Sequence, residues 1–247
     1  MSAKVAIFGA TSAIAMELAR EYARTGAQLY LVGRNASKLD ALATSLGTAV
    51  VGHAQQDFDV TGEAGVCVSR AIASLGGLDV AVLAHGLLGD QLQSESNLQV
   101  AEQIAHTNYA SAIALLIPLA NYFEQRGGGH LAVLSTVAAD RGRPRNYTYA
   151  AAKSALNTYL QGLRSRLYAR GVQVHTIKLG PVDTPMTVDH EKNLLFAKAP
   201  DVARGIRRAI ERGQSEAYVP RFWQPIMFAV RNLPEPLFQR VRALSGR

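Results

Sequence analysis

Short apolar runs alternate with amphipathic helical stretches along most of this chain, and this alternation restricts the fold more than any other feature. Val80 to Ala84, for example, is apolar without interruption. A strand with no polar face must be covered on both sides, which is typical of parallel sheets. The pattern predicts strands over residues 4–8, 29–32, 49–51, 78–84, 130–135, 172–179 and 216–219, and helices over 13–25, 36–46, 61–75, 97–125, 147–170 and 201–212.

Strands and helices that alternate with short connections predict an α/β fold. We expect a doubly wound, Rossmann-type parallel sheet with helices on both faces. No linker or internal repeat divides the 247 residues, so we expect a single domain over 1–247. Its last part, residues 218–247, is an amphipathic tail in which aromatic residues, arginines and prolines alternate.

Charge and cysteine content exclude several classes of protein. The net charge of +7 is concentrated in residues 201–247, which hold nine Arg against four acidic residues. No recognition helix or basic–aromatic array accompanies this charge, so we expect no nucleic-acid binding. The lone Cys67 excludes an internal disulfide and indicates a reducing, cytoplasmic compartment. The six histidines are scattered, which argues against a metal site, and no apolar run approaches the ~20 residues of a membrane span.

Tyr149 and Lys153 carry the clearest chemical signal. They are four residues apart in a predicted helix, so both side chains point to the same face. An ammonium beside a phenol stabilises the phenolate and therefore lowers the phenol's pKa. Such a pair suits an enzyme that transfers a proton to a carbonyl oxygen near neutral pH.

The turn after the first predicted strand offers a site for a phosphate group. Gly9 permits a tight turn, Thr11 and Ser12 add hydroxyl donors, and Ile14 follows in the first turn of the helix. Free backbone N–H groups at a helix N-terminus bind anions such as a pyrophosphate. An ordinary strand–helix turn with a Ser/Thr cap explains the same residues.

Residues that follow the next strands suggest which dinucleotide would bind. Arg34 follows the second strand, where an acid would select NAD and an arginine can pair with the 2′-phosphate of NADP. Asp59 follows the third strand and suits either adenine contacts or a helix cap. Ala84 and Gly86 follow the fourth and permit a close backbone approach. We therefore expect NADP(H) as the cofactor, with NAD(H) as the alternative. The other explanation of Arg34 is an ordinary surface residue without a role in binding.

Taken together, these motifs resemble the short-chain dehydrogenase/reductase family over nearly the whole chain. The matching positions occur in order: the glycine turn, Ala84-His85-Gly86, Asn108, Ser135-Thr136, Tyr149 with Lys153, and Leu179-Gly180-Pro181-Val182-x-Thr184. The resemblance implies that Tyr149 is the general acid/base and that Lys153 lowers its pKa and holds the nicotinamide ribose. It further implies that Asn108 anchors a water linked to Lys153, and that Pro181, Val182 and Thr184 contact the nicotinamide and pyrophosphate side of the cofactor.

The chain departs from the family pattern at three places. Ala13 and Ala15 replace the usual second and third glycines of the turn, and the usual Asn before Ala-Gly is absent. The hydroxyl that orients the substrate carbonyl falls on Thr136, which offers the same donor and acceptor as a serine. We expect Thr136 in this role and Ser135 as the second choice for a substrate contact.

A loop of basic residues and the tail suggest a substrate. Arg141, Arg143 and Arg145 lie between the Ser/Thr pair and Tyr149, where they can bind a substrate phosphate or form a solvated basic loop. Two stretches, residues 84–90 and 218–238, resemble a narrower group of the family, reductases of decaprenyl-phosphoryl keto-pentoses. The tail suits a membrane contact through Phe222, Trp223 and Met227, a lid over the substrate, or a subunit contact.

These observations predict an NAD(P)H-dependent oxidoreductase that reduces a carbonyl, or oxidises the corresponding alcohol, on a small-molecule or lipid-linked substrate. The alternative is a nucleotide-binding regulatory protein of the same fold without turnover, which the Ala13 and Ala15 replacements favour and the intact Tyr149 and Lys153 oppose. We expect a homodimer or homotetramer in the cytoplasm, with peripheral membrane contact through the tail as a further expectation.

Overall fold

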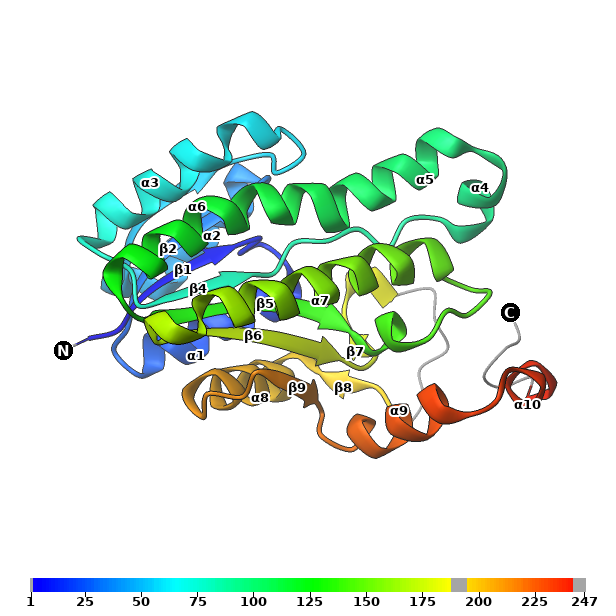
Figure 1. Cartoon of the computed structure of the whole chain (residues 1–247). Helices are drawn as coiled ribbons and strands as arrows, with labels where there is room; N and C mark the ends of the chain where they lie inside the picture. The colour runs from blue at the N-terminus through cyan, green and yellow to red at the C-terminus, as the bar shows by residue number, and fades with distance from the viewer. Residues whose placement is uncertain (1, 188–194, 242–247) are drawn as a thin grey trace.

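The computed structural model describes residues 2–187 and 195–241, and its centre is a seven-stranded parallel sheet (Figure 1). The strand order is β3-β2-β1-β4-β5-β6-β9, and every neighbouring pair runs parallel. The strands are β1 (Lys4–Phe8), β2 (Gln28–Gly33), β3 (Val50–Gln55), β4 (Val80–Leu83), β5 (Gly129–Thr136), β6 (Val172–Leu179) and β9 (Glu216–Val219). The order reverses between β1 and β4, so ligands are expected above their carboxyl ends.

Helices cover both faces of this sheet, as the uninterrupted apolar strands require (Figure 1). One apolar core joins the sheet to α3 (Ala64–Leu75), α6 (Ser111–Arg126) and α7 (Tyr147–Leu167). The other joins it to α1 (Ala13–Arg24), α2 (Ala36–Leu46) and α8 (Ala199–Glu211). The predicted doubly wound Rossmann-type α/β fold is confirmed.

Two elements differ from the sequence prediction in their extent. β3 reaches Gln55 rather than ending at residue 51, and its residues alternate between half-buried and exposed because it is an edge strand. The helix predicted over 97–125 is a helical run made of α5 (Leu98–Ala105), the π-helix η3 (His106–Ala110) and α6. The short helix α4 (Gln91–Ser96), which the sequence did not predict, precedes it.

The C-terminal tail forms two helices that pack beside the carboxyl ends of the strands. α9 (Trp223–Asn232) and α10 (Glu235–Arg240) bury Trp223, Met227 and Phe238 against Val137 of the 3-10 helix η4 (Val137–Asp140). The indole of Trp223 lies so close to Gly180 that a Cβ there would be 2.0 Å from Nε1. Trp223 and Met227 are therefore core residues, and the expectation that they insert into a membrane is wrong.

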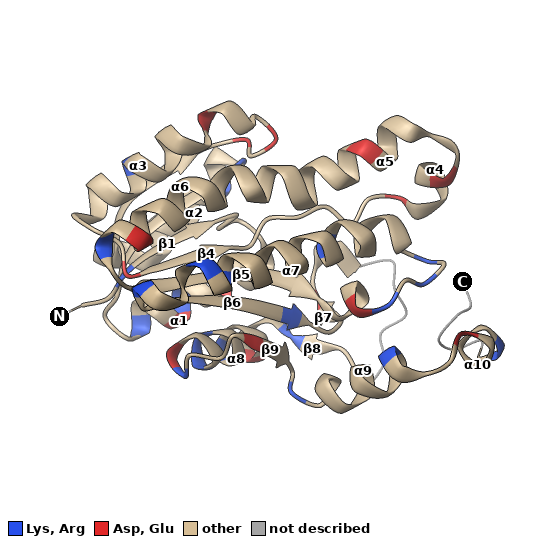
Figure 2. Cartoon of the chain, in the orientation of Figure 1, with Lys and Arg blue, Asp and Glu red and all other residues tan. Residues whose placement is uncertain are grey.

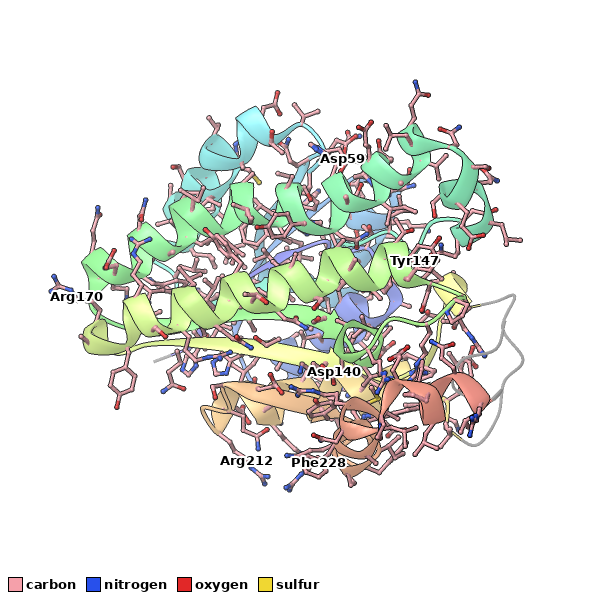
Figure 3. All side chains as sticks on the ribbon, turned by 45° about the vertical axis from the view of Figure 1, so that its right-hand side comes forward. Asp59, Asp140, Tyr147, Arg170, Arg212 and Phe228 are labelled. Atoms are coloured by element: carbon pink, nitrogen blue, oxygen red, sulfur yellow. The ribbon has the colours of Figure 1, made fainter. Side chains whose placement is uncertain are left out.

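The exposed apolar residues of the tail are different ones. Phe222, Ile226 and Phe228 are exposed on α9, and 71% of Phe228 is accessible. Figure 3 shows Phe228 on the outer side of the molecule. Within residues 2–187 and 195–241, no helix combines the length and apolar character that crossing a bilayer requires.

Candidate functional site

A cavity of about 230 Å³ opens above the carboxyl ends of β1, β2 and β4. Gly9, with φ +89°, turns the chain there because a Cβ at this position would lie 2.6 Å from the backbone nitrogen of His85. Most of the residues predicted to bind a cofactor line this cavity: Gly9, Thr11, Ser12, Arg34, Asp59, Ala84 and Gly86. The switch point of the sheet therefore brings together side chains from four separate segments.

The N-terminus of α1 faces this cavity with unpaired donors. The Ser12 side chain accepts a hydrogen bond from the Ala15 nitrogen at 3.3 Å, and the Ser12 carbonyl accepts one from Met16. The N–H groups of Ala13 and Ile14 have no carbonyl one turn earlier to bind, and within the described chain no other partner engages them. Together with the exposed Arg34 at the rim, these donors fit the phosphates of a dinucleotide.

Asp59 and His85 form the opposite wall. The carboxylate of Asp59 accepts hydrogen bonds from the Thr107 hydroxyl at 2.9 Å and from Gln103 at 2.8 Å, which ties it to η3. The His85 ring packs against Phe58 with 4.7 Å between centroids and a tilt of 37°, and it bonds to the Ser111 hydroxyl. Burial, followed by the charges of Lys153 and Arg34, lowers the pKa of His85 to about 3, so the ring is neutral.

Lys153, Asn108 and Gly86 meet beside this cavity. A Cβ at Gly86 would lie 2.9 Å from Asn108 Oδ1 and 3.4 Å from Lys153 Nζ, so only glycine fits without displacing them. Asn108 donates to the carbonyls of Leu87 and Ile104 at 2.6 and 2.8 Å and accepts from the Leu87 nitrogen at 3.1 Å. The Lys153 ammonium donates to the Leu134 carbonyl at 3.3 Å. The π-helix thus places the asparagine against the buried ammonium.

Burial sets the proton affinities of Tyr149 and Lys153. It raises the pKa of the Tyr149 phenol to about 12 and lowers the pKa of the Lys153 ammonium to about 8. The sequence predicted that the neighbouring cation would lower the phenol's pKa. In the structure desolvation is the dominant effect, so Tyr149 keeps its proton near neutral pH.

The two hydroxyl residues at the end of β5 point to different surroundings. Ser135 is buried and donates to Asn157 Oδ1 at 2.7 Å. Thr136 is half-buried, and its Oγ1 accepts from the Ala138 nitrogen at 3.1 Å, which leaves its hydroxyl hydrogen free to donate. The alternation of side chains along the strand therefore directs Ser135 into the protein and Thr136 to the opposite, more exposed face, and the role of Thr136 stays a prediction.

The three arginines of the basic loop have different environments. Arg141 donates to the carbonyls of Val230 and Leu233, bonds to Glu235 and lies 4.0 Å over the Phe238 ring. These contacts hold the tail, and the predicted substrate contact of Arg141 stays a prediction. Arg145 is exposed, whereas Arg143 is half-buried and reaches the Met227 sulfur at 3.7 Å.

The segment after β6 covers the cavity from the remaining side. Pro181 accepts a hydrogen bond from the Ala197 nitrogen, and Val182 is buried in the short strand β7 (Val182–Asp183), which pairs with β8 (Ala197–Lys198). The Thr184 nitrogen binds the Thr187 hydroxyl. Met186 of the 3-10 helix η6 (Pro185–Thr187) lines the cavity, although no sequence pattern predicted it.

A buried polar network beneath the basic loop also escaped the sequence prediction. Lys178, at the end of β6, binds Asp140 at 2.7 Å and Glu216 at 3.0 Å. The Tyr218 hydroxyl donates to the other oxygen of Asp140 at 2.7 Å. The lysine at position 178, near the end of a predicted strand, was the sequence feature that could have indicated this network. Among the described residues, no group of His, Cys, Asp or Glu side chains could hold a metal ion.

Comparison with known proteins agrees with this geometry. A family model described as short chain dehydrogenase matches residues 3–194. An uncharacterized oxidoreductase of Mycobacterium tuberculosis is 35% identical over 243 residues, which cover 97% of each chain. An uncharacterized oxidoreductase of Streptomyces coelicolor is 32% identical over 240 residues, covering 95% of this chain and 94% of its own. A short chain dehydrogenase from Burkholderia cenocepacia, solved in complex with NADP, is 20% identical with a TM-score of 0.84 over 97% of this chain and 98% of its own.

Proposed function

Since the chain belongs to the short-chain dehydrogenase family and is an oxidoreductase, we propose that it reduces a carbonyl group with NADPH. The observation that carries the proposal is the buried Lys153 ammonium. It lies between Gly86, Asn108 and the end of β5, on the same helical face as Tyr149 and beside the cavity that Gly86 lines. A buried cation on the same helical face as a phenol can stabilise a phenolate that forms during the reaction.

Each residue of the site has a definable task. A bound nicotinamide would supply the hydride. Thr136 would donate a hydrogen bond to the substrate carbonyl, and Tyr149 would give that oxygen its proton. Lys153 would stabilise the resulting phenolate, and Asn108 would fix the loop after β4 against Lys153. Because burial raises its pKa, Tyr149 is protonated before the reaction, as a proton donor must be.

The choice of NADPH rests on Arg34. Its side chain is exposed at the rim of the cavity, and no acid takes the corresponding place after β2. A guanidinium there can pair with a 2′-phosphate through two parallel hydrogen bonds. NADH is the alternative cofactor.

The tail supports a further part of the proposal, contact with a membrane that carries a lipid-linked keto-sugar phosphate. Its exposed apolar residues include Phe222, Ile226 and Phe228, with Arg221 and Arg231 nearby. Apolar side chains beside basic ones suit the surface of an anionic bilayer. The same face also suits a subunit contact in a homodimer or homotetramer.

The test of the central proposal is Tyr149→Phe, which removes the transferable proton and retains the ring. We expect oxidation of NADPH with a panel of aldehydes and ketones to fall by about 10²–10⁴-fold, while the affinity for NADPH is kept. A variant with wild-type turnover would refute the role of Tyr149. A wild-type protein that binds NADPH but turns over no carbonyl would favour the alternative, a nucleotide-binding regulatory protein.

A further inference from the structure

Three arginines follow η4 within five residues, but among the described residues only one of them has a buried side-chain nitrogen without a hydrogen-bond partner. Figure 2 shows the basic residues of this loop between η4 and α7, opposite α9. Arg141 is fully engaged with the tail, and Arg145 is exposed to solvent. Arg143 lies between them with its Nε buried and without a hydrogen-bond partner among the described residues.

The remaining contacts of Arg143 do not compensate its charge. Its Nη2 reaches only the Met227 sulfur, a weak acceptor, at 3.7 Å. Asp140 is the nearby acid, but Lys178 and the Tyr218 hydroxyl already occupy its two oxygens. Burial, and then the charge of Arg145, lower the pKa of Arg143 despite the opposing effect of Asp140.

The surroundings of Arg143 belong to the substrate side of the site. Its loop connects η4, which follows Thr136, with α7, which carries Tyr149 in its first turn. Figure 3 shows Asp140 and Tyr147 at the two ends of the loop, with Asp140 next to the tail helices. The side-chain oxygen of Asn146 in the same loop is also buried without a partner, so an acceptor accompanies the unpaired donor.

A partly desolvated cation without a counter-ion destabilises a protein unless a ligand supplies the charge. Met227, which Arg143 contacts, belongs to an apolar cluster with Val137 and Tyr218. We propose that Arg143 binds an anionic group, a phosphate or a carboxylate, on the substrate whose carbonyl Tyr149 protonates. The position of the substrate carbonyl in this proposal rests on the proposed function. The binding of an anionic group rests only on the environment of Arg143.

Matched substrates test this directly. We would compare hydroxyacetone phosphate with hydroxyacetone, and carboxybenzaldehyde with benzaldehyde, using wild type, Arg143→Met and Arg143→Lys. Arg143→Met should lower kcat/KM by about 10- to 100-fold for the anionic member of each pair and leave the neutral member within about twofold. Equal losses for both members would overturn the proposal, because they would indicate a structural role.

The controls separate a specific contact from a general effect of charge. Arg231→Met removes the same charge from an exposed position on α9 and should change neither ratio. An equal loss in Arg145→Met would indicate attraction by the loop as a whole and would contradict the assignment to Arg143. Because Arg143 has no counter-ion, its replacement by Met should leave Tm unchanged or raise it.

A binding measurement works even if no tested carbonyl is reduced. Trp223 is the only tryptophan of the chain, and it packs in the same cluster as Met227. With saturating NADP⁺ and constant ionic strength, glycerol phosphate should change its fluorescence in wild type and Arg231→Met but not in Arg143→Met. Identical titrations of all three proteins would refute anion binding at Arg143, whereas failure of turnover alone would refute only the proposed function.

Discussion

Lys153→Met should make the protein more stable and abolish its activity. Lys153 is 3% exposed, and burial lowers its pKa from 10.5 to about 8. This shift corresponds to about 3 kcal/mol of unfavourable free energy in the folded, charged state. Loss of the 3.3 Å bond to the Leu134 carbonyl offsets about 1 kcal/mol of that. The free energy of unfolding should therefore rise by about 2 kcal/mol near pH 7, or Tm by about 4–8 °C.

The pH dependence identifies the cause of this gain. In wild type the folded state loses the Lys153 proton above about pH 8, whereas the unfolded chain keeps it to about 10.5. The unfolded state therefore binds more protons in this window, and wild-type stability rises with pH through it. The advantage of Lys153→Met should be complete below about pH 8 and should disappear towards pH 10.5.

Chemical unfolding of the cofactor-free protein near pH 7 and near pH 10 measures both quantities. Lys38→Met, which removes an exposed ammonium, is the control and should change stability little at either pH. A Lys153→Met variant less stable than wild type near pH 7, or an advantage independent of pH, would refute the reasoning. Turnover should be lost because nothing then stabilises the Tyr149 phenolate.

Four further substitutions probe the cofactor site, the Lys153 contact and the tail. Arg34→Asp should weaken NADPH binding by about 10-fold or more and favour NADH, measured as dissociation constants; equal affinities in wild type would refute the role of Arg34. Gly86→Ala places a Cβ 2.9 Å from Asn108 Oδ1 and should reduce turnover, with unchanged circular dichroism as the control. Gly180→Ala should displace Trp223, lower the free energy of unfolding by ~1–3 kcal/mol and shift the tryptophan emission to the red. An unshifted emission spectrum would contradict the packing of Trp223 against Gly180. Phe228→Ser should reduce co-sedimentation with anionic liposomes; wild-type protein that stays in the supernatant would favour a subunit contact.

The sequence was sufficient where local pattern determines structure. Uninterrupted apolar strands such as the one that begins at Val80 require two covered faces, and this predicts the parallel sheet with helices on both sides. The positions of Gly9 and Arg34 after successive strands predicted that they would share one edge of the sheet, and both line the same cavity.

The sequence was insufficient where the outcome depends on residues far apart in the chain. The basic loop alone does not reveal that α10 supplies Glu235 and Phe238 as partners of Arg141, whose substrate contact stays a prediction. The pKa of Tyr149 depends on how deeply α7 is buried, which a four-residue spacing does not reveal. Trp223 likewise looks like a membrane anchor unless its fit against Gly180 is known.

Because of the π-helix η3, the number of residues in the helical run from α5 to α6 determines both the position of Asn108 and the orientation of α6. A π turn contains one residue more than an α turn closes, so every later residue of the run is rotated by about 100° relative to a regular α-helix. The buried stripe of α6, including Leu115, Leu116 and Leu119, is in register with the sheet only with that extra residue present. Deleting one residue between His106 and Ala110 would therefore force a choice: either α6 turns its apolar side away from the core, or Asn108 leaves Leu87 and Lys153. Substitutions in this run act on one side chain at a time, whereas a change of length acts on the core and the site together.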